Sequence, residues 1–230
     1  ATTVVPRPQP DKSLTKIDPP AVNVTPAALA RLRAVKVPGM VGHWAFHTGM
    51  SGRAKRRGLI DAERRVVDLA GRLNGTILGE VNLRQAGGIE ALVLDGRTNS
   101  VMLASDHSTA GLPRQQISAE AWVRIDKPQS WGGIIGAIQD NGSYERGWIL
   151  GYQGSKFCFA VNATGGEDKL TYLVGTSDFK SETWYHVVGT YDGTTQKIFV
   201  NGVLENSSTS QSGDINYPPQ AFYEIGAYHD

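Results

Sequence analysis

The sequence predicts an all-β fold in which two antiparallel sheets pack against each other as a sandwich. Many short segments are rich in aromatic and β-branched residues and are separated by Gly, Asn, Asp and Pro. The composition, with 27 glycines and 11 prolines among 230 residues, suits a turn-rich β protein. Long runs of helix-forming residues are lacking, so we expect helix to be the minor element. The length suits one sizeable domain plus a tail.

The clearest β signal is the stretch 184–204, "WYHVVGTYDGTTQKIFVNGVL". Its first eight residues alternate between two faces as a strand requires, and Asp192-Gly193 then supplies a tight turn. The returning strand runs into Asn201-Gly202, a strong turn signal because both central residues of such a turn need positive φ. We therefore expect the chain to fold back twice here, with Asn and Gly shaping turns rather than doing chemistry.

Further segments show the same strand character and are bounded by turn residues. In chain order they are residues 40–46, 90–96, 100–105, 117–125, 132–138, 147–153, 156–163, 170–176 and 222–228. No exact repeat of 20 to 50 residues appears, which argues against a solenoid or a propeller.

Residues 1–36 are predicted to form a Pro-rich arm or linker that ends in a short helix. Six of the 23 residues 4–26 are prolines, and large apolar side chains are few, so this segment should be extended. Thr25 suits the N-cap of the helix, Pro26 its first position, and Pro38-Gly39 its end. The sandwich domain is then expected to comprise residues 37–230.

The net charge of +1 hides an uneven distribution. Residues 1–72 hold 13 Lys and Arg against five Asp and Glu, whereas residues 73–230 hold ten against 17. Segment 51–65 is the most basic stretch and lacks strand alternation, so we interpret it as an insertion. The insertion either docks on an acidic partner or is a solvated surface segment without a partner. No recognition helix or stacking platform accompanies it, so we expect a protein or lipid surface rather than nucleic acid. The candidate partner-binding residues are Arg53, Lys55, Arg56, Arg57, Arg64 and Arg65.

Cys158 is the only cysteine, which excludes an internal disulfide and a Cys-rich zinc site. Its position between Phe157 and Phe159 in a strand pattern predicts a small buried core residue. No run of about 18 apolar residues is present, so no transmembrane segment is expected. The start at Ala1 with a polar, Pro-containing stretch is compatible with an exported, periplasmic or extracellular chain, although an arbitrary cut in a longer chain would look the same.

Five motifs in order resemble the bacterial laminin-G-like, concanavalin-A-like domains. They are "GMVGHWAF", "VVDLAGRLNGTI", "LVLDGRTNSVML", "ISAEAWVRI" and the hairpin "TWYHVVGTYDGTTQKIFVNGVL", and "EIGAY" is similar to a late strand of the family. The resemblance covers about residues 38–228 and implies a jelly-roll sandwich. Two features depart from the family pattern: the basic insertion 51–65, and the lack of a closing strand after Tyr228. The missing strand leaves two alternatives: a truncated sequence, or another segment or a partner that supplies the pairing.

Catalytic motifs are absent from the sequence. Sandwich glucanases carry carboxylates alternately on one strand, whereas Glu120 is alone in its strand and Glu167-Asp168 would point to opposite faces. The five histidines form no HExxH motif, and no Gly-x-Ser-x-Gly elbow is found. A Ser-His-Asp triad stays open, because its members need not be adjacent in sequence. With no motif for catalysis, we expect this chain not to be an enzyme.

Calcium is the only cofactor that the sequence favours. Relatives of this fold bind Ca²⁺ through loop oxygens, and its preference for hard ligands points to four side chains: Asp68, Asn74, Asp95 and Asn99. The competing and favoured explanation is that these Asp and Asn residues make turns by hydrogen bonding to nearby backbone groups.

Two functions follow as expectations. The first is a non-catalytic extracytoplasmic interaction module, an accessory subunit docked on a larger protein assembly such as a membrane-bound electron-transfer complex, because similar domains occur beside cytochrome modules. The alternative is a lectin-like carbohydrate-binding module, since sugar faces stack on exposed aromatic rings. The candidate glycan-binding residues, which lie near predicted loops or strand ends, are Trp131, Tyr144, Trp148 and Tyr152.

Overall fold

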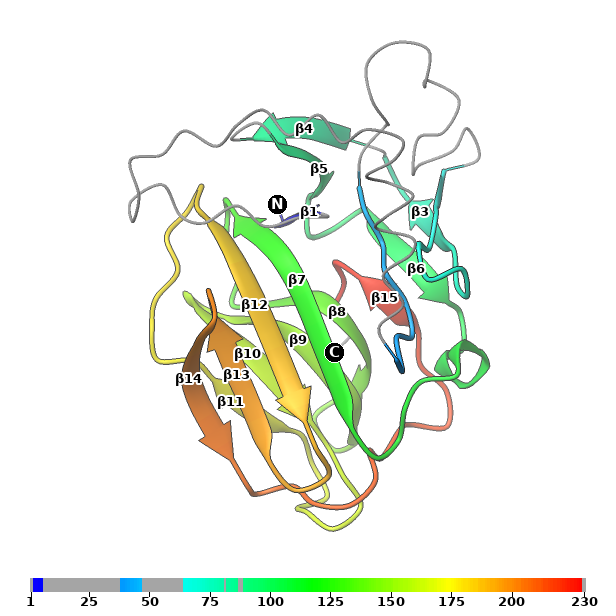
Figure 1. Ribbon diagram of the computed structural model, residues 1–230, viewed down its shortest axis with the longest axis vertical. Coiled ribbons are helices and arrows are strands. Elements are labelled where there is room, and N and C mark those ends of the chain that lie inside the picture. The colour runs from blue at the N-terminus through cyan, green and yellow to red at the C-terminus, as the bar shows by residue number, and fades with distance from the viewer. Residues whose placement is uncertain (1, 6–37, 47–63, 81, 87–88, 229–230) are drawn as a thin grey trace.

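The computed structural model is an antiparallel sandwich of two sheets (Figure 1). It describes residues 2–5, 38–46, 64–80, 82–86 and 89–228. The predicted all-β class is therefore confirmed. The helix expected before Pro38 and most of the basic segment 51–65 lie outside the described residues.

The first layer is a seven-stranded sheet, whose outer face is toward the viewer in Figure 1. Its order is β14 (Val203–Ser208), β13 (Gln196–Val200), β12 (Trp184–Tyr191), β7 (Ile117–Ile125), β1 (Thr2–Val5), β5 (Ile89–Leu94) and β4 (Asn82–Ala86). The two predicted turns are present here, since β12, β13 and β14 follow each other as hairpins and Asn201 and Gly202 have φ of 51° and 81°.

The second layer is an eight-stranded sheet that lies behind the first. Its order is β11 (Thr171–Val174), β10 (Lys156–Val161), β9 (Glu145–Gln153), β8 (Trp131–Asp140), β15 (Tyr223–Ile225), β6 (Ser100–Ala104), β3 (Gly75–Leu78) and β2 (Arg65–Val66). A single 3₁₀ turn, η1 (His107–Ala110), is the helical element of the described residues.

Strand β1 lies at the start of the predicted N-terminal arm and is part of the sandwich. Thr2–Val5 pairs antiparallel with β5 on one side and with β7 on the other, so it occupies an inner position of the seven-stranded sheet. In the sheet order β1 is the strand that joins the β4–β5 hairpin to the remaining four strands. An inner position of the seven-stranded sheet is thus filled by a segment from the start of the described chain.

The segment 40–46 differs from its prediction as a strand. It contributes a single bridge, between Trp44 and Asp68, although Phe46 is fully buried and the Trp44 indole packs against the core. The Trp44 Nε1 donates to the Leu73 carbonyl oxygen at 2.7 Å. Trp44 and Phe46 therefore pack against the core, but the backbone of this segment does not form a run of paired strand residues.

The core lies between the two sheets and follows from strand alternation. In β7, Ile117, Val123 and Ile125 are buried, whereas Ser118 and Glu120 face solvent. Rings and aliphatic side chains of the eight-stranded sheet meet them; Leu150, Phe157 and Phe159 are each at most 1% exposed. Each such side chain contributes about 1.5–3 kcal/mol by its burial, so the apolar faces hold the layers together. Cys158 is also buried, as predicted.

The C-terminal segment crosses the strand β8, and this crossing positions the site described below. A Cβ on Gly133 would lie 1.7 Å from the Ala227 carbonyl oxygen, so only glycine allows this close approach. The crossing carries Tyr228 onto the outer face of the eight-stranded sheet, where it packs against a small second cluster of Ile138, Ile149, Ala160 and Leu170. Within the described ranges, no helix is long and apolar enough to cross a membrane.

Candidate functional site

Two of the four predicted metal ligands, Asp68 and Asn74, form a buried turn. The Asp68 carboxylate is 3% exposed and accepts hydrogen bonds from the backbone N–H groups of His43, Ala70, Arg72 and Leu73 at 2.8 to 2.9 Å. The Asn74 Oδ1 accepts from the Asp68 N–H at 3.0 Å. The structure thus gives both side chains the turn-making role.

The other two, Asp95 and Asn99, also form a turn, in which Asp95 is exposed and Asn99 is buried. The Asp95 carboxylate accepts from the backbone N–H groups of Arg97, Thr98 and Asn99 and from the Thr98 hydroxyl. These bonds, first that from the Thr98 hydroxyl, hold the pKa of Asp95 well below its usual range. In the described part of the chain no group of three His, Cys, Asp or Glu side chains is arranged to hold a metal ion. Calcium binding stays a prediction.

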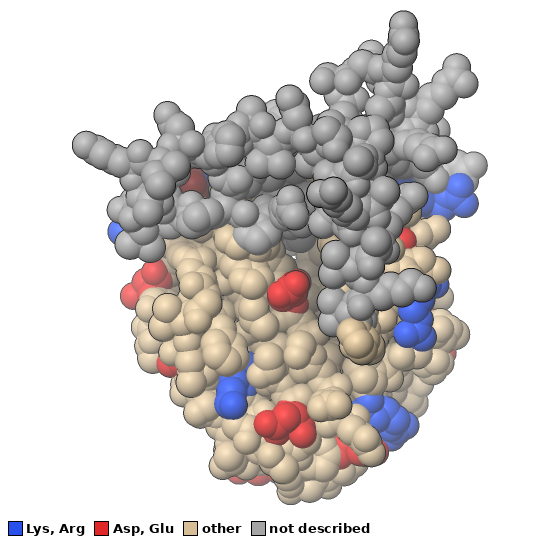
Figure 2. Space-filling model, viewed as in Figure 1, with Lys and Arg blue, Asp and Glu red and all other residues tan. Residues whose placement is uncertain are grey.

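Of the six predicted docking residues, four lie outside the described residues: Arg53, Lys55, Arg56 and Arg57. Arg64 and Arg65 are exposed. The Arg64 guanidinium donates to the Gly79 carbonyl oxygen and Arg65 begins β2, so both help to fix this edge of the sheet. On the face shown in Figure 2, the described Lys and Arg side chains form separate spots, with acidic side chains between them.

Two of the four predicted glycan-binding aromatics, Trp148 and Tyr152, are not exposed, so that part of the prediction is wrong. They lie in β9 with exposures of 1% and 2% and face the interior. The Trp148 Nε1 donates to the Tyr217 hydroxyl at 3.0 Å, so its polar group is satisfied internally. The alternation of β9 places both rings on the core side, which their position in a turn-rich sequence does not reveal.

Trp131 and Tyr144 are half-buried. Tyr144 lies in the β8–β9 turn with the Arg146 guanidinium 4.7 Å from its ring centre. Trp131 begins β8, and its ring lies 4.9 Å from the Tyr172 ring and 6.1 Å from the Tyr228 ring. Three aromatic side chains from distant parts of the sequence therefore gather on the outer face of the eight-stranded sheet.

Asp140 connects this aromatic cluster to a pocket. Its Oδ2 accepts hydrogen bonds from the Tyr172 hydroxyl at 2.5 Å and the Tyr228 hydroxyl at 2.7 Å. Burial, followed by the hydrogen bond to Asp140, raises the pKa of Tyr172 far above its usual value, so this phenol stays a donor. Asp140 ends β8 and is held in one orientation by two residues that are not its neighbours in sequence.

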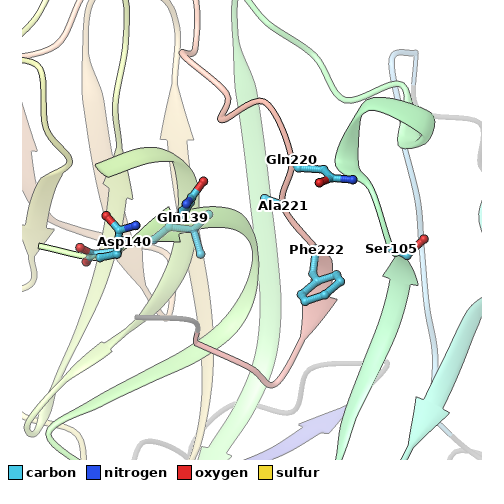
Figure 3. A pocket seen from close by; sticks show the side chains of 8 residues that line it. Ser105, Gln139, Asp140, Gln220, Ala221 and Phe222 are labelled. Atoms are coloured by element: carbon cyan, nitrogen blue, oxygen red, sulfur yellow. The ribbon is translucent and has the colours of Figure 1, made fainter. Parts of the chain in front are cut away.

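The pocket lies between the end of β8 and the segment that enters β15, and has a volume of about 480 Å³ (Figure 3). Its lining combines an apolar floor with amide, hydroxyl and carboxylate groups. The residues are Ser105, Ile138, Gln139, Asp140, Asn141, Gln220, Ala221 and Phe222. Phe222 is 45% exposed, one of the few large apolar side chains at the surface of the described chain. In Figure 3, Gln139 and Asp140 lie across from Gln220 and Phe222.

Most of these residues carry no functional signal in the sequence. Phe222 falls in the predicted strand 222–228, where alternation alone does not say whether a side chain is buried or exposed, and Gln220 belongs to no motif. The available signal is the Pro-Pro of 218–219, which marks a loop directly before an aromatic residue. The residues come together only through the pairing of β15 with β8.

Residues 95–230 match the family Laminin_G_3, which is described as the concanavalin A-like lectin/glucanases superfamily. The chain belongs to this superfamily. The match confirms the resemblance from residue 95 onward. It includes the whole pocket lining and the hairpins of β12, β13 and β14.

A curated relative is Pappalysin-1 of Mus musculus, which is 29% identical over 139 residues. The aligned region covers 56% of this chain and 8% of that protein, so this chain spans a small part of its relative's length.

Two solved structures share the fold. The binding domain of Paraclostridial Mosquitocidal Protein 1 has a TM-score of 0.51 and 12% identity, covering 73% of this chain and 46% of that one. A Trypanosoma rangeli sialidase mutant displaying trans-sialidase activity has a TM-score of 0.50 and 14% identity, covering 84% and 28%. At these identities the likeness concerns the fold alone.

Proposed function

We propose that this domain is a non-catalytic carbohydrate-binding module and that the pocket at the end of β8 holds the sugar. The observation that carries the proposal is an exposed ring, Phe222, in the same pocket as a carboxylate, Asp140, that two tyrosine hydroxyls hold in place. The proposal agrees with membership in a lectin and glucanase superfamily.

The lining suits the two kinds of surface that a sugar presents. The C–H face of a pyranose ring packs on an aromatic face, which Phe222 offers. Sugar hydroxyls both donate and accept hydrogen bonds, and the amide groups of Gln139, Asn141 and Gln220 can do the same, while the Asp140 carboxylate accepts. The volume of about 480 Å³ lies within the usual range of small-molecule sites. A single sugar residue or the end of a short oligosaccharide would fit.

The pocket lining favours binding over hydrolysis and neutral sugars over acidic ones. Glycoside hydrolysis uses two carboxyl groups on either side of the scissile bond, and Asp140 is the single carboxylate among the lining residues. It is also the single charged group of the lining, so a uronic or sialic acid would bring a second negative charge into the pocket. We therefore propose neutral sugars as ligands.

The test is a titration of the purified chain with neutral and acidic oligosaccharides, followed by calorimetry or by NMR shifts. Phe222→Ala is expected to weaken binding of a neutral sugar at least about tenfold, a loss of about 1.4 kcal/mol. Leu204→Ala is the matched control, because Leu204 is 50% exposed and lies on β14, the edge strand of the other sheet. Equal binding by both variants, or no binding of any sugar with and without Ca²⁺, would overturn the proposal.

A sugar-binding module can be one part of a larger extracytoplasmic assembly. The docking predicted for the six basic residues and the predicted export of the chain stay predictions beside the proposed function.

A further inference from the structure

The chain contains three Asn-Gly pairs, Asn74-Gly75, Asn141-Gly142 and Asn201-Gly202. In such a pair the backbone nitrogen of glycine can attack the Cγ of asparagine, because glycine lacks the Cβ that would hinder the approach. A carbon–nitrogen bond forms, a five-membered succinimide closes, and ammonia leaves. Water then opens the ring at either carbonyl and gives aspartate or isoaspartate. One water is consumed and one ammonia is released, so the reaction needs no other reagent.

Two of these pairs are held in place by the structure. The Asn74 Oδ1 accepts from the Asp68 N–H at 3.0 Å, and Gly75 is buried in β3, paired with β2. The Asn201 Oδ1 accepts from the His186 N–H at 2.9 Å, and the Asn201 N–H donates to the His186 carbonyl oxygen at 2.7 Å. Ring closure at either site would break a hydrogen bond or move a strand.

The third pair is not held in this way. Asn141 and Gly142 lie in the exposed β8–β9 turn, and the turn is closed by backbone bonds: Asn141 N–H to the Tyr144 carbonyl at 3.3 Å and Ser143 N–H to the Asn141 carbonyl at 2.9 Å. Among the described residues, neither the Asn141 side-chain amide nor the Gly142 N–H has a hydrogen-bond partner. Open space surrounds the α-carbon of Gly142 where a Cβ would stand, and its φ is +76°. The attacking nitrogen and the attacked carbon are therefore both accessible.

We propose that Asn141 is a site of spontaneous deamidation in the folded protein, and that it reacts well before Asn74 and Asn201. The position matters because Asn141 lines the pocket and follows Asp140 directly. Conversion to aspartate or isoaspartate removes an amide and adds a second carboxylate to a lining that otherwise holds one. The modification does not depend on what the pocket binds.

The test follows the three sites in one sample. The folded chain is incubated in mildly alkaline buffer, digested, and each Asn-Gly peptide is examined by mass spectrometry for the mass gain that accompanies exchange of an amide for an acid. Asn141 is expected to react at least about tenfold faster than the other two, a difference in activation free energy of about 1.4 kcal/mol. A parallel sample in denaturant is the control, because the three sites share the following glycine and should then react at similar rates.

Two variants make the result decisive. Gly142→Ala and Asn141→Gln are each expected to suppress the modification at this position while leaving Asn74 and Asn201 as they are in the parent chain. Similar rates at the three sites in the folded chain, or an intact Asn141 in the folded chain beside a reactive one in denaturant, would overturn the proposal.

Discussion

Replacing Asp68 with alanine should destabilise the domain far more than the same change at Asp95. Both carboxylates accept four hydrogen bonds in a turn, but Asp68 is 3% exposed whereas Asp95 faces solvent. Bonds to an ionised acceptor contribute about 1.5–3 kcal/mol each, so four bonds at the lower limit would sum to about 6 kcal/mol. Relaxation of the turn and entry of water recover part of this, and we expect a loss of about 3–5 kcal/mol for Asp68→Ala.

At Asp95 water replaces the lost acceptor, so Asp95→Ala should cost about 1 kcal/mol, as at an ordinary cap. The assay is urea unfolding followed by fluorescence, with the midpoints compared at constant m-value. If Asp68→Ala lowers the free energy of unfolding by no more than Asp95→Ala does, the assignment of Asp68 to a buried structural turn is incorrect. Asp68→Asn is the companion variant, since it keeps the shape of the side chain and one acceptor oxygen. Its loss in free energy of unfolding should lie between those of Asp95→Ala and Asp68→Ala.

Two further predictions concern titrating groups. The Asp95 pKa lies below its unfolded value, so this carboxylate contributes stability above about pH 3.8 that is lost as the pH falls. The difference in stability between the parent chain and Asp95→Ala should therefore shrink when urea unfolding is repeated in acid. A difference that grows in acid would contradict the hydrogen bonds assigned to Asp95. Burial raises the pKa of the Cys158 thiol to about 12. A thiol reagent should therefore leave the folded chain unlabelled and modify it fully in denaturant. Rapid labelling of the folded chain would place Cys158 outside the core.

The fold could be predicted because its signals are local. The strand 117–125 has the predicted bounds, and the turns after β12 and β13 follow from Asp-Gly and Asn-Gly pairs whose backbone angles few other residues adopt. The strands that were missed are short and contain few large apolar residues. Strand β1 is the clearest case, because four residues beside several prolines become a strand only through partners far along the chain.

The candidate site could be predicted only in part, because its residues meet through topology. Trp131 is half-buried on the outer face of its sheet. Alternation does not say which face of β9 points inward, so the sequence does not reveal that Trp148 and Tyr152 lie in the core. The side chains of Asp140 and Phe222 share a pocket because β15 pairs with β8, and no short motif in the sequence reports a pairing between such distant segments.

The inner position of β1 gives the chain a mechanical property. A pull applied to the residue 2 end draws this strand lengthwise between β5 and β7, so the hydrogen bonds on both of its edges are loaded in shear at the same moment rather than opened one after another. Once the strand slides out, the described sheet is divided into a hairpin and a group of four strands. Tension on the N-terminal side would thus be resisted by the hydrogen bonds of these four residues, and the strand would detach in one abrupt step.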